Sequence, residues 1–250
     1  MFDLSGRTAI VTGAGRGLGK AIALALAEAG ADLVAVARTT SEIEATAAAA
    51  RQRGRRALVV PTDVTQVAQV NAMVEQAMAE YGKVDVLVNN VGLYWPKPAL
   101  EVTDEEWDYV LRTVLHSQFY CVRAVGRHMV EQRYGKIINI GSHWGMIGVA
   151  NNVPYSVAKG AVLQMTKALA VEWARYGVRV NAICPGHIRT QLTEKELADP
   201  KIYALIMRHL PLKYVSEPKD IAPLAVYLAS AASDFMTGSS LVIDGGQNAE

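Results

Sequence analysis

Ser142, Tyr155 and Lys159 are residues of the types that can move a proton to or from a carbonyl oxygen. A tyrosine phenol can protonate a developing alkoxide, but its ordinary pKa of about 10 makes exchange difficult at neutral pH. A nearby cation lowers that pKa, and in a helix Lys159 lies one turn after Tyr155 on the same face. Ser142 can donate a hydrogen bond to the oxygen as it gains charge. Tyrosine–lysine pairs at this spacing are common on helix surfaces, so the pattern needs support elsewhere.

A glycine-rich segment provides that support near the N-terminus. Its residues are Thr12, Gly13, Ala14, Gly15, Arg16, Gly17, Leu18 and Gly19. They follow an apolar, β-rich run and precede a helical stretch, and they fit T-G-x-x-x-G-x-G rather than G-x-G-x-x-G. Glycines here let the backbone approach a pyrophosphate, and the helix N-terminus supplies free N–H groups. A simple packing turn would give a similar pattern.

Two further segments that follow apolar runs have polar groups suited to a nucleotide. Asp63 and Val64 follow the third run, where a carboxylate can hold an adenine amino group. Asn89, Asn90 and Gly92 lie at the end of the fourth, where amides can support the cofactor. Taken alone, the Asn89-Asn90 pair is more typical of a turn at a strand end.

The residues after the second apolar run favour NADP(H) over NAD(H). An acidic residue there binds the ribose 2′-hydroxyl, whereas an arginine accommodates a 2′-phosphate. The sequence there is Val36-Ala37-Arg38-Thr39-Thr40, without a carboxylate. Arg38 can pair with a phosphate bidentately, Thr39 can add a hydrogen bond, and Arg16 can reach the same phosphate. The competing interpretation is that both arginines are solvated surface residues.

The pattern of apolar runs and helical stretches predicts one α/β domain over residues 1–250, a Rossmann-like, doubly wound parallel sheet with helices on both faces. Most runs are almost entirely apolar, as expected of parallel strands covered on both sides. The expected strands are Thr8–Thr12, Leu33–Ala37, Ala57–Pro61, Val84–Asn89, Lys136–Gly141, Val178–Ile183 and Leu241–Asp244. The expected helices are Gly17–Ala29, Glu42–Arg53, Val67–Tyr81, Asp104–Gln132, Val153–Tyr176 and Lys219–Ala229.

Composition excludes several other classes of protein. The 250 residues are 51% hydrophobic with a net charge of +1, so no broad basic field favours nucleic acid. No apolar run is long enough to cross a membrane, and the first residues lack the apolar stretch of a signal peptide. Cys121 and Cys184 fall in apolar segments and are expected to be buried free thiols. A cytoplasmic enzyme acting on a small molecule fits these observations.

Large or polar side chains at the expected strand ends are candidates for a substrate pocket. These residues are Tyr94, Trp95, His143, Trp144, Asn151 and His187. Their aromatic groups suggest a partly apolar pocket, although each of them can equally be a packed loop residue. No metal-ligand spacing is present, so no metal is expected. Residues 189–213 are expected to form a mobile lid over bound substrate.

Taken together, these motifs resemble the short-chain dehydrogenase/reductase family, in its single-domain type of about 250 residues, including members similar to 3-oxoacyl carrier-protein reductases. The resemblance implies a Rossmann fold with seven parallel strands, pyridine-nucleotide binding and a serine–tyrosine–lysine active site. It implies that Ile188 and Thr190 contact the nicotinamide end and that Pro185 and Gly186 also bind the cofactor. It also implies a homotetramer or homodimer.

One position departs from the family. An asparagine is usual in the long helix after the Asn-Asn-x-Gly turn, where it is thought to order a water next to the lysine. Here that position is Val114, which cannot donate or accept a side-chain hydrogen bond. We interpret this as a change in proton relay, because the three groups that touch substrate are present.

The leading hypothesis is an NADP(H)-dependent oxidoreductase that interconverts a ketone and a secondary alcohol. A 3-oxoacyl thioester, a sugar or polyol, and a small ketone all remain open as substrates, with a slight preference for a free small molecule. The alternative is a nucleotide-binding relative with a regulatory or structural role and weak catalysis, which only Val114 supports.

Overall fold

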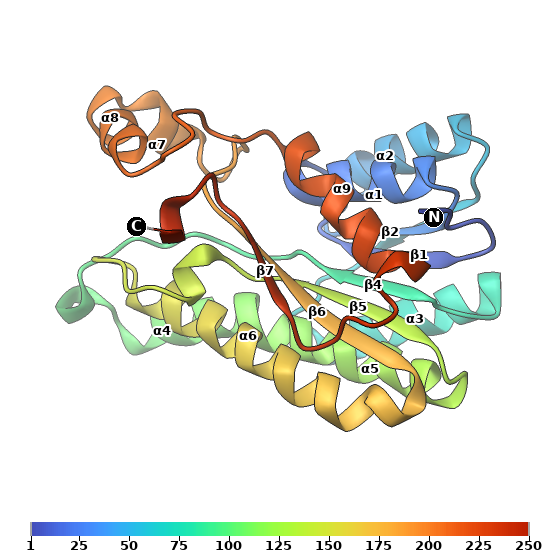
Figure 1. The fold of residues 1–250 in the computed structure, drawn as a ribbon. Coiled ribbons are helices and arrows are strands. Elements are labelled where there is room, and N and C mark those ends of the chain that lie inside the picture. The colour runs from blue at the N-terminus through green and yellow to red at the C-terminus, as the bar shows by residue number, and fades with distance from the viewer. Residues whose placement is uncertain (1, 250) are drawn as a thin grey trace.

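Seven parallel strands form the central sheet of the computed structural model, which describes residues 2–249 (Figure 1). Their order is β3-β2-β1-β4-β5-β6-β7. The strands are β1 (Thr8–Thr12), β2 (Asp32–Ala37), β3 (Ala57–Pro61), β4 (Val86–Asn89), β5 (Gly135–Ile140), β6 (Val178–Pro185) and β7 (Ser240–Ile243). The predicted doubly wound parallel sheet is confirmed, and most predicted strand ends fall within two residues of those observed.

Two layers of helices cover the sheet. The helices are α1 (Gly17–Glu28), α2 (Thr40–Gln52), α3 (Val67–Tyr81), α4 (Asp104–Leu111), α5 (Ser117–Glu131), α6 (Val153–Trp173), α7 (Glu194–Ala198), α8 (Pro200–Arg208) and α9 (Pro218–Ala229). Figure 1 shows α1, α2 and α9 on one face and α3, α4, α5 and α6 on the other. All residues of β1 and β5 are buried, because both faces of these strands meet apolar helix surfaces.

The apolar core is correspondingly divided by the sheet. On one side Ile22 and Leu26 of α1 and Ile221 of α9 pack onto strand residues. On the other side Met73 of α3 and Val122 of α5 do the same. Removing these side chains from water stabilises the fold by about 25 cal/mol per Å² of buried apolar surface. This packing holds the strand ends in place relative to one another.

The predicted continuous helix Asp104–Gln132 is wrong in one respect. Between α4 and α5 the residues Arg112–His116 form a π-helical turn. The Ser117 hydroxyl donates to the Thr113 carbonyl oxygen at 2.6 Å and gives that carbonyl a partner. Such turns insert one residue into a helix and change which side chains face inward, and they occur frequently at functional sites. A capping box between Thr103 and Glu106 starts α4.

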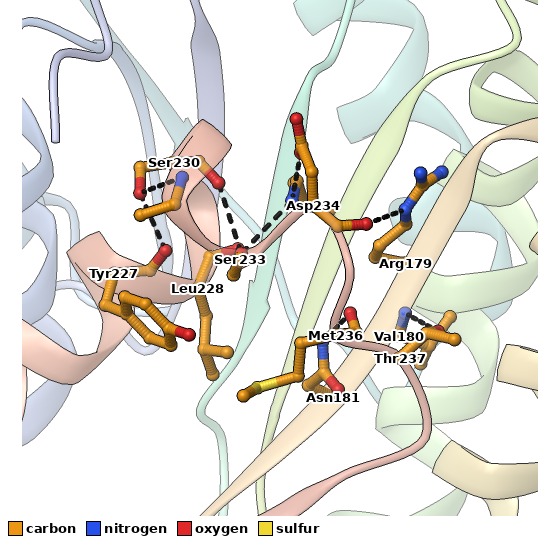
Figure 2. Close-up of polar contacts among 12 residues, drawn as sticks. Arg179, Val180, Asn181, Tyr227, Leu228, Ser230, Ser233, Asp234, Met236 and Thr237 are labelled. Atoms are coloured by element: carbon orange, nitrogen blue, oxygen red, sulfur yellow. Dashed lines mark hydrogen bonds and ion pairs between the residues drawn. The ribbon is translucent and has the colours of Figure 1, made fainter. Parts of the chain in front are cut away.

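The end of the sheet where β6 begins is closed by hydrogen bonds from the connection between α9 and β7. Figure 2 shows Arg179 Nε donating to the Asp234 carbonyl oxygen at 2.9 Å, and Asn181 Nδ2 donating to the Met236 carbonyl oxygen at 2.9 Å. The Ser233 hydroxyl donates to the Leu228 carbonyl oxygen at 2.9 Å. This connection is therefore bound to the sheet along its length.

The segment 189–213 is more regular than its polar sequence suggested, because it contains α7 and α8. The Asp199 carboxylate caps α8 by accepting from the backbone N–H groups of Lys201 and Ile202. The two helices stand apart from both helix layers (Figure 1). No helix within residues 2–249 is long and apolar enough to span a membrane, and both cysteines are buried free thiols as predicted.

Candidate active site

A cavity of about 650 Å³ lies at the carboxyl ends of the strands and collects most of the residues singled out from the sequence. Those that line it are Gly13, Gly15, Arg16, Gly17, Leu18, Arg38, Thr39, Asp63, Val64, Asn90, Gly92, Tyr94, Ser142, His143, Trp144, Tyr155, Lys159, Pro185, Gly186, His187, Ile188 and Thr190. Gly19, Trp95 and Asn151 lie outside its lining. Glu42, Thr65 and Glu196 also line it, although no sequence pattern points to them.

The glycine turn connects β1 to α1 in a shape that only glycine allows at two positions. Gly13 has φ +67°, in the left-handed region. A Cβ at Gly19 would lie 2.1 Å from the Gly13 carbonyl oxygen, so only glycine fits at this position, which lies behind the residues that line the cavity. Asn90 Nδ2 donates to the Thr12 carbonyl oxygen at 3.1 Å and ties the end of β4 to this turn. The turn therefore presents free backbone N–H groups at the start of α1, where a pyrophosphate fits.

The second strand end carries charges of both signs. Arg38 and Thr39 lie in the cavity lining as expected from the sequence. Glu42, one turn into α2, also lies there, and its Oε1 is 3.8 Å from Arg16 Nη1. Glu42 was not anticipated, because only a helix starting at Thr40 brings that carboxylate back toward the glycine turn. The Asp63 carboxylate uses Oδ1 to accept from the Thr65 hydroxyl at 2.8 Å.

Ser142, Tyr155 and Lys159 meet although they come from two different elements. Ser142 follows β5, and its hydroxyl oxygen accepts from the Trp144 backbone N–H at 3.1 Å, which holds the serine at the start of a short 3-10 turn. Tyr155 and Lys159 lie on α6, with Lys159 Nζ 5.7 Å from the centre of the Tyr155 ring. Lys159 Nζ also donates to the Ile140 carbonyl oxygen at 2.6 Å. Helix and strand are thus joined at the site itself.

The electrostatics differ from the expectation that Lys159 lowers the pKa of Tyr155. Burial raises the pKa of Tyr155 to about 12, and the hydrogen bond with Ser142 only partly opposes it. Burial also lowers the pKa of Lys159 to about 8. Both shifts have the same cause, because removing a group from water disfavours its charged form. The Lys159 ammonium is therefore still mostly protonated at neutral pH.

Val114 lies in the π-helical turn and is completely buried. It packs in an apolar cluster with Val110, Ala158 and the Tyr155 ring. Val114 therefore packs against α6, the helix that carries Tyr155 and Lys159.

Aromatic rings surround the Tyr155 phenol. The rings of Tyr94 and Trp144 lie with their centres 6.2 Å and 6.3 Å from that of Tyr155, both in edge-to-face orientation. The His187 ring lies 5.3 Å from that of Trp144. Burial and a hydrogen bond to the Glu196 carboxylate raise the pKa of Tyr94, which keeps its hydroxyl protonated. Trp95 instead packs on Tyr109, 5.8 Å between centres.

His143 is a buried, neutral member of this wall. Its Nδ1 is 2.9 Å from the Pro185 carbonyl oxygen, and because a carbonyl only accepts, Nδ1 carries the proton. Burial lowers the pKa of His143 to about 4. Its Nε2 is buried without a partner among the described residues. Asn151 lies farther away, at the surface with φ +58°, and its carbonyl oxygen accepts from the Lys97 N–H at 2.7 Å.

Comparison with known proteins places this chain among oxidoreductases. The family model described as enoyl-(acyl carrier protein) reductase matches residues 13–248. The 5-keto-D-gluconate 5-reductase of Escherichia coli (strain K12) is 35% identical over 246 residues, which cover 98% of this chain and 97% of that protein.

Solved structures agree over the full length. A short-chain type dehydrogenase/reductase from Mycobacterium marinum is 40% identical with a TM-score of 0.95, covering 100% of this chain and 98% of that one. A gluconate 5-dehydrogenase from Burkholderia cenocepacia J2315, in complex with NADP and tartrate, is 36% identical with a TM-score of 0.96 over the same shares. This chain therefore belongs to the short-chain dehydrogenase/reductase family of oxidoreductases.

Proposed function

We propose that this protein interconverts a ketone and a secondary alcohol on a free small molecule, using NADP(H). The observation that supports this most directly is the meeting of Ser142, Tyr155 and Lys159 in the same cavity as the glycine turn and Arg38. One end of the cavity is suited to a dinucleotide and the other to proton transfer.

The residues present fit an NADP(H) molecule. The glycine turn presents backbone N–H groups at the start of α1, and a Cβ at Gly19 would collide with the Gly13 carbonyl oxygen, so this turn requires glycine there. Thr190 lies against the same turn, because a Cβ at Gly17 would meet its methyl group at 3.5 Å. Arg38 supplies a guanidinium for a 2′-phosphate. The solved gluconate 5-dehydrogenase from Burkholderia cenocepacia J2315 contains NADP.

Bound NADPH would supply the hydride, and residues of this chain position the substrate's carbonyl oxygen and give it a proton. Ser142 donates a hydrogen bond to the carbonyl oxygen, and Tyr155 gives its phenolic proton to that oxygen as the alkoxide forms. Lys159 has three N–H donors, of which the Ile140 carbonyl oxygen takes one. The other two can hold ribose hydroxyls, and the ammonium stabilises the phenolate that remains. Alcohol oxidation is the reverse of these steps.

Two observations support a free substrate rather than a carrier-bound thioester. Residues 189–213 carry acidic side chains among the basic ones, with Glu194, Glu196 and Asp199 beside Lys195 and Lys201, so no basic surface is formed for an acidic carrier. The relatives named for their substrates include 5-keto-D-gluconate 5-reductase and gluconate 5-dehydrogenase, which act on free molecules.

The test is oxidation of NADPH and NADH by the purified protein with a panel of ketones, β-keto esters and keto sugars. We expect consumption of NADPH that the Tyr155→Phe variant loses, and a preference for NADPH that the Arg38→Asp variant reverses. A thermal shift with NADPH but no turnover of any ketone would contradict this function and favour a binding protein. Equal use of NADH, unchanged by Arg38→Asp, would contradict the cofactor assignment alone.

We also propose that the chain self-associates through α5 and α6. Phe119 on α5 and Val157 and Val171 on α6 are exposed apolar side chains, with Val171 84% exposed. Burying such surfaces favours association. Native mass spectrometry of the purified protein should find a dimer or tetramer, and Val171→Glu should shift it toward the monomer. A monomer at micromolar concentration would contradict this proposal.

A further inference from the structure

A second cavity, of about 440 Å³, adjoins the catalytic one. The two share the side chains of Tyr94, His143, Trp144, His187 and Glu196, which line both of them. Because Tyr94 and Trp144 also flank the Tyr155 ring, the second cavity begins directly beyond the aromatic wall around the catalytic phenol. A substrate whose carbonyl lies at Tyr155 can extend its carbon skeleton into this space.

The far side of the second cavity is mostly aliphatic. Its walls there are Ile147 and Val149 from the loop before α6 and Ile202, Leu205 and Ile206 from α8, with His209 and Gln247 as the two polar residues. Ile147 and Leu205 are 44% and 57% exposed, so much of their surface faces open space. An apolar group placed between this loop and α8 would remove that surface from water, which is favourable in proportion to the area covered.

The charge in this cavity is unsuited to an anion. Glu196 is the only lining residue with a permanent charge, and no lysine or arginine lines the cavity within residues 2–249. His143 is held neutral by burial, which lowers its pKa to about 4. A carboxylate entering here would meet the Glu196 carboxylate without a lysine or arginine to pair with. Desolvating an unpaired charge is costly.

We propose that the second cavity receives the uncharged, apolar carbon body that extends from the reacting carbonyl carbon, so that the preferred substrates are neutral cyclic ketones and their alcohols rather than anionic sugar acids. This inference rests on the proposed function and narrows its substrate class. Ile147, Ile202 and Leu205 offer a sugar acid neither a cation nor a hydrogen-bonding partner.

The experiment compares kcat/KM with NADPH for cyclohexanone, 4-methylcyclohexanone and 5-keto-D-gluconate. We expect 4-methylcyclohexanone to exceed 5-keto-D-gluconate at least about tenfold, and to exceed cyclohexanone by about tenfold, because one methyl group in an apolar pocket is worth about that much. A higher kcat/KM for 5-keto-D-gluconate would overturn the inference and leave the proposed function standing.

A charged variant tests the cavity directly. Leu205→Lys places an ammonium among the aliphatic walls and should lower kcat/KM for 4-methylcyclohexanone about tenfold. It should thereby lower the ratio of kcat/KM for 4-methylcyclohexanone to kcat/KM for 5-keto-D-gluconate. Phe235→Lys adds the same charge at a fully exposed position outside the lining of both cavities, and should change neither rate. Equal rates in wild type and Leu205→Lys would overturn the inference.

Binding separates this inference from the chemistry. If no ketone oxidises NADPH, the proposed function fails. The second cavity can still be tested by calorimetric titration of 4-methylcyclohexanone into the protein with saturating NADP⁺, which measures binding of the ketone. Binding that Leu205→Lys weakens about tenfold supports an apolar site. If 4-methylcyclohexanone does not bind and D-gluconate does, the inference of an apolar site is overturned.

Discussion

Two buried lysines at opposite ends of β5 have different surroundings. Lys136, near its start, is 1% exposed, and its Nζ donates to the Ser233 hydroxyl at 3.1 Å and lies 2.8 Å from Asp234 Oδ1. Lys159, on α6, is 3% exposed and reaches the carbonyl oxygen of Ile140, the last residue of β5. Burial lowers the pKa of both, but within residues 2–249 only Lys136 has a carboxylate partner.

We infer from this difference that the Lys136 end of the sheet serves stability and the Lys159 end serves the proposed chemistry. At the Lys136 end, several hydrogen bonds join the connection between α9 and β7 to β6 (Figure 2), and the Lys136 ammonium pairs with the Asp234 carboxylate. At the Lys159 end, the ammonium has no acidic partner, and His143 Nε2 has no partner among the described residues. Polar groups left without a partner are costly to folding and are tolerated where they act on a ligand.

Exchanging each lysine for an apolar residue of similar length should separate the two roles most clearly. Lys159→Met should lower kcat/KM by about 10²- to 10⁴-fold, because the phenolate and the cofactor lose their cation. Lys136→Met should keep kcat/KM within about twofold, since it is distant from the cavity. It should lower the free energy of unfolding by about 1–2 kcal/mol through lost hydrogen bonds.

Steady-state kinetics and urea unfolding of both variants make this measurement. A loss of activity in Lys136→Met as large as in Lys159→Met would break the comparison, because both ends would then serve catalysis.

The two serines allow the same comparison at a smaller scale. Ser142→Ala should lower kcat by about 10²- to 10³-fold, as expected when a donor to a developing oxyanion is removed, with little change in thermal stability. Ser233→Ala removes a donor to the Leu228 carbonyl oxygen and an acceptor for Lys136, and should cost about 1–2 kcal/mol of stability. Kinetics and thermal unfolding of the pair are the measurement, and the opposite assignment of effects would contradict it.

The pH dependence sharpens the contrast further. With the pKa of Lys159 at about 8, kcat/KM for ketone reduction should fall about tenfold per pH unit above pH 8 as the ammonium loses its proton. Lys159→Arg stays protonated, so any activity it retains should not fall there. A wild-type profile that is flat from pH 8 to 10 would contradict this cause.

The same pKa has a consequence for stability with a definite sign. The folded pKa of about 8 lies below the ordinary 10.5, so between these values the unfolded chain binds more protons, and stability rises with pH. The penalty for burying the Lys159 ammonium is fully present below pH 8 and is relieved toward pH 10.5. Lys159→Met should therefore be more stable than wild type at pH 7, and this advantage should shrink by pH 10.5 in thermal unfolding measurements.

The smallest expected effect concerns Glu42, which lies 3.8 Å from Arg16 at the cofactor end. Glu42→Gln removes a negative charge near the proposed 2′-phosphate position and should tighten NADPH binding about two- to fivefold, in line with an exposed ion pair. Glu44→Gln, on the same helix, affects an ion pair with Arg51 and serves as the matched control. Fluorescence titration with NADPH measures both, and equal affinities would contradict this role for Glu42.

The sequence by itself determined the sheet and the places where chemistry can occur. Strands such as β1 and β5 are recognisable because a parallel strand covered on both faces needs an apolar run. Gly13, Ser142 and Pro185 then stand directly at the ends of such runs, and parallel strands bring their carboxyl ends to one edge. Local spacing also determined that Tyr155 and Lys159 share a helix face.

Only the tertiary structure decided how these residues behave. Packing between segments far apart in the chain produces the π-helical turn around Val114, the approach of Glu42 to Arg16 and the second cavity, which α8 lines. The pKa of Tyr155 was expected to be lowered by a neighbouring charge, yet burial raises it, because desolvation depends on every element that surrounds the ring. Sequence spacing determines which groups can meet, and packing decides how much water remains around them.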